Sequence, residues 1–232
     1  MYLRTYVAEV GILTPKAMIK SLFKERLSLK LRELKHYNKM EKMLNVVIFG
    51  APGSGKGTQS ENLIEKYGLA HISTGDVLRA EIKAGTELGK VADSFISKGQ
   101  LLPDELIIDI LADTLDKKEK SKGVIFDGFP RTIPQAVALK KMLAERGMEI
   151  SIVIGLEVAE EELIDRLLKR GQASGRSDDN IDTIKSRLEV YNNQTNPLKE
   201  FYINEKLYAG IKGEGSIDGI FADIKKAIAL LD

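Results

Sequence analysis

The order of apolar and polar residues after Met43 changes repeatedly between two patterns. Short, nearly continuous apolar runs are typical of buried β-strands, whereas apolar residues that recur every three or four positions are typical of amphipathic helices. The short runs predict strands over Leu44–Phe49, Gly123–Asp127, Ser151–Val158 and Leu207–Lys212. The helical spacing predicts helices over Thr58–Tyr67, Pro134–Arg146, Glu160–Arg170, Asp179–Asn193 and Ile217–Leu231, together with a charged, mostly helical stretch over Thr74–Lys98.

Strands that alternate with helices predict a parallel sheet, because parallel strands need crossover connections and these are usually helical. Helices on both faces then bury the sheet, which gives a three-layer fold. The chain has 232 residues, of which 43% are hydrophobic, and this is enough to bury a sizeable core. The expected fold class is therefore α/β with a central parallel sheet.

Residues 1–42 differ from the rest of the chain in charge. They contain ten Lys or Arg and four Glu, a net charge of +6, whereas the whole chain carries +1. Apolar residues recur at helical spacing from Pro15 onward, which predicts a basic amphipathic helix. Such a helix suits a membrane surface, a nucleic acid or a partner subunit. We favour an extension that contributes nothing to activity, since Met43 directly precedes a strand and can itself be a translation start.

The composition excludes several kinds of site. Without cysteine there is neither a disulfide framework nor a thiolate zinc site, and two histidines make a histidine-rich metal site improbable. No apolar run reaches the roughly 20 residues that span a bilayer, and the first residues lack the pattern of a signal peptide. We expect a cytoplasmic protein with neither nucleic acid nor membrane as partner.

A glycine-rich loop, GAPGSGKGTQ over Gly50–Gln59, lies between the first predicted strand and the first predicted helix. It is similar to the phosphate-binding loop G-x-x-x-x-G-K-[ST], except that Gly57 follows Lys56 and the hydroxyl comes one place later, at Thr58. Glycines let successive backbone N–H groups face phosphates, and the lysine reaches the outer phosphates. The context predicts a P-loop that binds ATP, in preference to a simple βα connection.

A second motif, GVIFDGFPR, places a carboxylate at the end of an apolar strand. In a parallel sheet this end lies at the edge where α/β proteins bind ligands. We therefore expect Asp127 near Mg²⁺, directly or through a water, in preference to a turn-capping role. In HISTGDVLR, Thr74 and Gly75 open a predicted helix with Arg79 one turn in, and Arg131 follows the aspartate strand; both arginines can bind a phosphate.

A third group of arginines lies in DRLLKRGQASGRSDDNIDTIKSRL. Arg166 and Arg170 are four residues apart and so share a helix face, and Arg176 and Arg187 follow beyond a short glycine-containing segment. Taken alone, such arginines often pair with acidic residues in water and contribute well under about 1 kcal/mol.

Four motifs in this order, GAPGSGKGTQ, ISTGDVLR, DGFPRTIPQA and GRSDD, resemble those of the nucleoside monophosphate kinase family, most closely its members that phosphorylate AMP. The resemblance covers the chain from about Met43 to its end and includes the displaced threonine of the loop. It implies a P-loop NTPase-type fold over residues 43–232, with a helical AMP-binding insertion over 73–102 and a short lid over 170–179. It also implies a monomer that transfers a phosphoryl group reversibly from MgATP to AMP, giving two ADP.

The resemblance also implies roles for individual residues. ATP would be bound by Gly53, Ser54, Gly55, Lys56, Gly57, Thr58, Arg166, Arg170 and Gly215. AMP would be bound by Thr74, Arg79, Gln100, Leu101, Leu102, Gly128, Phe129, Arg131, Gln135, Arg176 and Arg187. The catalytic group would comprise Lys56, Arg131, Arg166, Arg170, Arg176, Arg187, Asp178 and Asp179. Asp127 would order Mg²⁺ through water, with the metal carried by ATP, and the short lid implies no zinc.

Three alternatives differ from this prediction. UMP/CMP kinases of the same fold usually carry alanine at the place of Thr74 and asparagine after the GFPR arginine, whereas STGD and GFPRTIPQ here favour AMP. A GTPase switch needs an N/TKxD motif after the loop, and the similar string NKME at Asn38–Glu41 precedes it. A non-catalytic ATP-binding module is disfavoured because the lysine, the aspartate and the expected arginines occur together.

Overall fold

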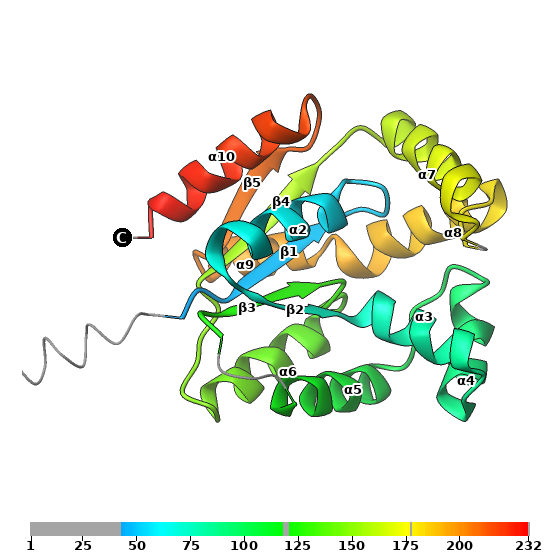
Figure 1. Cartoon of the computed structure of the whole chain (residues 1–232), viewed down its shortest axis with the longest axis horizontal. Helices are drawn as coiled ribbons and strands as arrows, with labels where there is room; N and C mark the ends of the chain where they lie inside the picture. Colours follow the sequence, from blue (N-terminus) through cyan, green and yellow to red (C-terminus); the bar gives the residue numbers. More distant parts are fainter. Residues whose placement is uncertain (1–42, 118–120, 177, 232) are drawn as a thin grey trace, which may run out of the picture. The chain divides into compact units, whose positions relative to one another are not determined.

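The computed structural model describes residues 43–117, 121–176 and 178–231. The predicted basic helix within residues 1–42 lies outside this part of the chain. The described residues form alternating strands and helices (Figure 1).

Five parallel strands form one sheet in the described part of the chain. They are β1 (Val46–Gly50), β2 (Ala70–Ser73), β3 (Val124–Asp127), β4 (Ile152–Glu157) and β5 (Tyr208–Lys212), in the spatial order β2-β3-β1-β4-β5. The central strand β1 pairs on both sides, with Val46 opposite Ile125 of β3 and Ile152 of β4. The predicted parallel α/β fold is confirmed.

The four predicted strands match β1, β3, β4 and β5 to within two residues at each end. The fifth strand, β2, was not predicted. Its sequence AHIS is only four residues long and has a single fully buried side chain, Ile72, which is too short a pattern to show a strand period.

Nine α-helices and one π-helical turn complete the described chain. They are α2 (Lys56–Tyr67), α3 (Thr74–Ala84), α4 (Glu87–Ile96), α5 (Asp104–Asp116), α6 (Ile133–Ala144), α7 (Glu160–Ser174), α8 (Ile181–Val190), the π-helical turn η1 (Tyr191–Thr195), α9 (Leu198–Asn204) and α10 (Ile217–Ala229). Several begin at a polar residue whose side chain accepts a hydrogen bond from a backbone N–H three residues on, as expected of N-caps. These caps are Ser73, Thr86, Thr132, Asn180 and Ser216. Within the described ranges, no helix is long and apolar enough to cross a membrane.

The helices differ from the predictions at three places. Helix α7 continues to Ser174, so Gly171 lies inside the helix, and the chain turns only at Gly175, whose φ of 64° ends the helix in the left-handed region. The predicted glycine-containing connection after Arg170 is therefore wrong in its first four residues. Helices α5 and α9 were not predicted; α9 has only seven residues, and α5 begins directly after Pro103.

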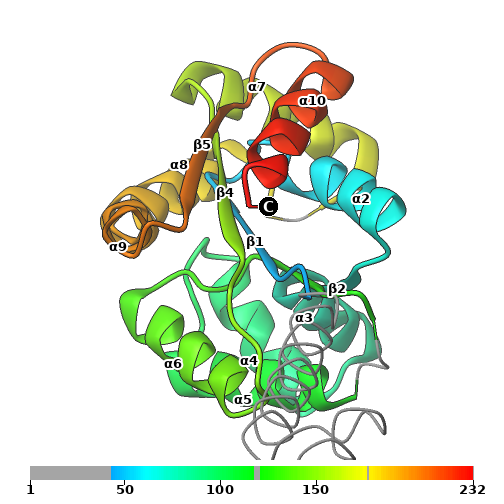
Figure 2. The same ribbon diagram turned by 90° about the vertical axis from the view of Figure 1, so that its left-hand side faces the viewer.

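The core lies on both faces of the sheet. Val47 and Phe49 of β1 face α5, α6 and α9, whereas Val46 and Ile48 face α2 and α10, because successive side chains of a strand point to opposite sides. Figure 2 shows α2 and α10 on one side of the strands and α6 and α9 on the other. The predicted three-layer arrangement is confirmed, and it places the carboxyl ends of all five strands along one edge.

Candidate nucleotide site

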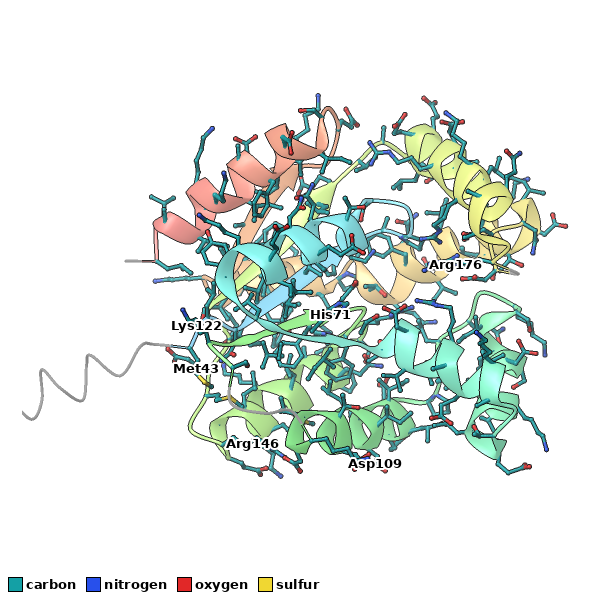
Figure 3. The ribbon with its side chains drawn as sticks, in the orientation of Figure 1. Met43, His71, Asp109, Lys122, Arg146 and Arg176 are labelled. Atoms are coloured by element: carbon teal, nitrogen blue, oxygen red, sulfur yellow. The ribbon has the colours of Figure 1, made fainter. Side chains whose placement is uncertain are left out.

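A cavity of about 630 Å³ lies at the carboxyl edge of the sheet. The loop after β1, the end of β3, helix α3 and the arginines of α7 and α8 line it. Figure 3 shows the side chains in this region, with His71 labelled on β2 and Arg176 labelled just after α7. Segments that are more than 100 residues apart in sequence therefore meet where parallel sheets bind their ligands.

The loop between β1 and α2 is shaped to receive phosphate. Gly53 and Gly55 have φ angles of 85° and 95°, which favour glycine, and a Cβ on Gly53 would lie 2.9 Å from the Leu163 carbonyl oxygen. Helix α2 begins at Lys56 and has no side-chain cap, which leaves its first N–H groups available to an anion. Both features are those of a P-loop.

Lys56 lies folded over this loop. Its Nζ donates hydrogen bonds to the carbonyl oxygens of Gly50 at 2.8 Å and Ala51 at 2.9 Å. Burial lowers the pKa of Lys56 to about 8; Asp127 acts to raise the pKa, whereas neighbouring arginines, Arg131 first among them, lower it further. An excess of positive charge near a buried ammonium indicates a site for a strongly anionic ligand.

Asp127 ends β3 and lines the same cavity, with its side chain 14% exposed. Its Oδ2 lies 3.8 Å from Nε2 of His71, a residue that sequence reasoning missed. In the three described segments, no three or more His, Asp or Glu side chains gather to hold a metal ion. A lone carboxylate facing a phosphate loop fits Mg²⁺, which keeps several waters and is bound through one or two carboxylates and the substrate phosphates.

Asp179 brings Arg170 of α7 and Arg187 of α8 together, and Asp178 adds a second contact to Arg187. Asp179, whose side chain is 0% exposed, accepts from Nε and Nη2 of Arg170 at 2.6 and 2.7 Å and from Nη1 of Arg187 at 2.7 Å. Asp178 lies 2.8 Å from Nη1 of Arg187. Although burial alone would raise it, the pKa of Asp179 is lowered because Arg170 donates to the carboxylate. Two guanidinium groups are thus held at the cavity.

Arg166 is held differently. Its Nε donates to Glu162 at 2.8 Å, the i,i+4 pairing that a surface helix would show, but its Nη1 also donates to the carbonyl oxygen of Gly213 at 3.0 Å. This second bond joins α7 to the loop between β5 and α10. Gly215 lies in that loop and is exposed. The bond thus connects the two segments that contain the predicted ATP-binding residues Arg166 and Gly215.

A second cavity adjoins the first and shares Arg79, Arg131 and Arg187 with it. Arg131 donates from Nε to the Gly128 carbonyl at 2.7 Å, and Thr74 donates to the same oxygen at 2.9 Å. Burial lowers the pKa of Arg131 to about 10, and the nearby Arg187 lowers it further, while Asp127 raises it. The shared arginines lie between two places that can each hold an anionic ligand.

Most of the predicted site residues line these two cavities. The larger one is lined by Gly53, Gly55, Lys56, Gly57, Thr58, Arg79, Leu101, Asp127, Gly128, Arg131, Arg166, Arg170, Arg176 and Arg187. The smaller one adds Thr74, Gln100, Leu102, Gln135 and Asp178. Four predicted residues line neither: Ser54, Phe129, Asp179 and Gly215. Phe129 is 1% exposed and belongs to the hydrophobic core, so its side chain is not placed to contact a ligand.

The parallel sheet, the P-loop and the two adjoining cavities with shared arginines define a P-loop nucleotide kinase, an enzyme that transfers a phosphoryl group between nucleotides. Comparison with known families narrows this class. Residues 48–207 match the family model described as adenylate kinase. The chain belongs to the adenylate kinase family.

Curated relatives agree with this membership. The chain is 69% identical over 189 residues to an adenylate kinase of Phocaeicola vulgatus, which covers 82% of this chain and 100% of the relative. It is 68% identical over 186 residues to an adenylate kinase of Bacteroides thetaiotaomicron, and this match covers 80% of this chain and 98% of the relative. An adenylate kinase of Porphyromonas gingivalis is 57% identical over 178 residues, covering 77% and 92%. The predicted resemblance to the nucleoside monophosphate kinases is confirmed.

Proposed function

We propose that Lys56, Arg131 and the arginines of α7 and α8 transfer the terminal phosphoryl group of ATP to AMP in this cleft, giving two ADP. The reversible transfer itself is the activity of the adenylate kinase family. The observation that carries the assignment of residues is the pair of adjoining cavities, one against the P-loop and one beside Thr74 and Gln135, with Arg79, Arg131 and Arg187 common to both. Product analysis with ATP and AMP, and with UMP and CMP as other acceptors, tests the proposal.

The mechanism requires positioning and charge, because the transition state of phosphoryl transfer spreads negative charge over the equatorial oxygens. The P-loop N–H groups and Lys56 would hold the donor phosphates, and Arg79 and Arg131 would hold the acceptor phosphate. Arg170 and Arg187, already fixed by Asp179, would stabilise the group in transit. No covalent nucleophile is needed, since the acceptor phosphate attacks directly.

Closure of the site accompanies this chemistry in our proposal. Segments 73–102 and 170–179 would move together over the nucleotides and exclude water, which would otherwise accept the phosphoryl group. Two hydrogen bonds connect the insertion to α8, the helix that follows residues 170–179: Thr183 donates to the Ser97 carbonyl at 3.2 Å, and Ser186 donates to the Lys98 carbonyl at 2.8 Å.

Mg²⁺ would enter with ATP, and Asp127 would hold its waters. The metal would neutralise phosphate charge.

We expect Asp127→Asn to raise the Mg²⁺ concentration that gives half-maximal rate by about tenfold or more, because residues that orient metal-bound groups contribute 10- to 100-fold to metal affinity. Initial rates at saturating nucleotide over a range of free Mg²⁺ measure it. Asp113→Asn, which removes an exposed α5 carboxylate paired with Lys117, is the control. An unshifted Mg²⁺ dependence in Asp127→Asn would contradict this role.

Residues 43–232 form the catalytic domain in our proposal, and residues 1–42 are dispensable. The full-length match to a relative of 189 residues supports this division. A shortened chain that starts at Met43 should keep kcat and both KM values within about twofold, because each proposed site residue follows Met43. Side-by-side assays of the two chains measure this. A loss of specific activity well beyond twofold would assign the extension a part in catalysis.

We also propose that the enzyme acts as a monomer in the cytoplasm, where its nucleotide substrates are present. One chain supplies all the lining residues of both cavities, so the proposed mechanism needs no residue from a second copy.

A further inference from the structure

The side-chain amide of Gln135 is held at both ends in the smaller cavity. Gln135 lies in the first turn of α6 and is only 2% exposed. Its Oε1 accepts from the backbone N–H of Arg131 at 2.8 Å, and its Nε2 donates to Oδ1 of Asp104 at 2.7 Å. Asp104, the first residue of α5, was not among the residues that the sequence pointed to.

These two partners admit one orientation of the amide. A carboxylate only accepts hydrogen bonds and a backbone N–H only donates them. Turning the amide by 180° would set its carbonyl against the Asp104 carboxylate and its NH₂ group against the Arg131 N–H, so both bonds would be lost. Asp104 is itself held in place, because Thr132 donates to its Oδ1 and Oδ2, each at 3.0 Å.

The fixed amide retains one free N–H and one free lone pair, because an amide carries two donors and two acceptor sites and has used one of each. Adenine presents an amino donor at N6 beside an acceptor at N1, which match the carbonyl and the NH₂ of such an amide. Guanine presents the opposite pair, an acceptor at O6 beside a donor at N1. A glutamine amide that binds guanine through these atoms must therefore have the opposite orientation.

We propose that Asp104 determines the base specificity of the acceptor site by fixing the Gln135 amide in the orientation that accepts adenine and rejects guanine. The proposal rests on the function proposed above, in which the smaller cavity takes AMP. Asp104 is a positioning residue in this scheme, since it acts through Gln135 and is absent from the cavity lining.

The test is the Asp104→Asn variant, assayed with AMP and with GMP as acceptors. Asparagine can donate or accept, so residue 104 no longer opposes the turned amide, and only the Arg131 N–H still favours the original orientation. We expect the ratio of kcat/KM for AMP to kcat/KM for GMP to fall about tenfold, the size of one orienting hydrogen bond, while KM for ATP stays unchanged. Glu105→Gln is the matched control, because it removes an exposed carboxylate from the same helical turn and should leave the ratio unchanged.

A purely structural role for Asp104 would lower the rates with AMP and GMP alike and keep their ratio, and this result would overturn the proposal. An equal change of ratio in Glu105→Gln would overturn it as well. Thermal unfolding midpoints of both variants identify a loss of folding, and GMP binding to folded Asp104→Asn by calorimetry then gives the same comparison without turnover. If the unaltered enzyme failed to phosphorylate AMP, the proposed function itself would fall. If the unaltered enzyme phosphorylated AMP and Asp104→Asn kept the same ratio of kcat/KM for AMP to kcat/KM for GMP, only the proposed role of Asp104 would be contradicted.

Discussion

Lys56→Met should lower kcat by about 10³-fold and leave the fold intact. The substitution keeps the length and apolar stem of the side chain but removes the ammonium group that lies over the P-loop carbonyls. Preorganised charges aimed at a developing negative charge each contribute about 10²- to 10³-fold, and phosphoryl transfer depends on such charges more than on any other effect. Steady-state ADP formation with saturating ATP and AMP measures the loss, and circular dichroism verifies the fold.

The charge of Lys56 also predicts a pH dependence. Its pKa is lowered to about 8 by burial, so the free enzyme carries the charge below this pH and loses it above. We therefore expect kcat/KM for MgATP to decline as pH rises through about 8 and this decline to vanish in Lys56→Met. Lys66→Met, at the exposed end of the same helix, should retain normal turnover and the normal pH profile. Near-normal turnover by Lys56→Met would contradict the assignment of the P-loop lysine.

Arg131→Ala should lower kcat by about 10³- to 10⁵-fold, the range known for arginines that stabilise phosphoryl transfer. Arg131 lines both cavities, and its Nε is held by the Gly128 carbonyl, so its Nη atoms are free to contact phosphate on either side. Arg131→Lys should restore only a small part of the rate, because an ammonium lacks the planar fork that binds phosphate through two parallel hydrogen bonds. Initial rates with both nucleotides varied separate kcat from the two KM values.

The matched control for Arg131 is Arg146→Ala. Arg146, which is labelled in Figure 3, is absent from the lining of both cavities. It pairs with Asp116 through Nε and Nη2 at 2.9 and 2.6 Å. Its removal should change kcat by less than about twofold. Equal losses in the two variants, or a normal rate in Arg131→Ala, would show that the shared position between the cavities carries no catalytic role.

The parts of the fold that sequence predicted best are those that end at the edge of the sheet. The P-loop and Asp127 each follow a short, nearly continuous apolar run, and parallel strands necessarily bring their carboxyl ends to one edge. Strand β2 was not predicted, because a four-residue segment that includes a histidine is too short to show the alternation of apolar and polar residues expected of a strand. The extent of α7 was misjudged because Gly171 reads as a break, yet it stays helical where α7 packs closely against Asp179.

The sequence predicted most of the residues that line the two cavities, but not the contacts among them. Motif order identified the arginines of α7 and α8 and the two aspartates between these helices, whereas the particular bonds from Arg170 and Arg187 to the buried Asp179 become evident only when the two helices pack. Asp104 lies 31 residues from Gln135, and the packing of α5 against α6 makes them neighbours. His71 gave no signal because its strand was not recognised. Contacts of this kind depend on tertiary packing that local patterns do not contain.

The central claim is that this cleft moves one phosphoryl group from ATP to AMP. Phosphorus NMR of the protein with Mg²⁺, ATP and AMP follows all reactants and products in one sample and tests the claim directly. The account predicts that ATP and AMP disappear in equal amounts, that two ADP form for each pair consumed, and that no inorganic phosphate accumulates. Release of inorganic phosphate with AMP unchanged, or no turnover with nucleotides bound, would contradict it.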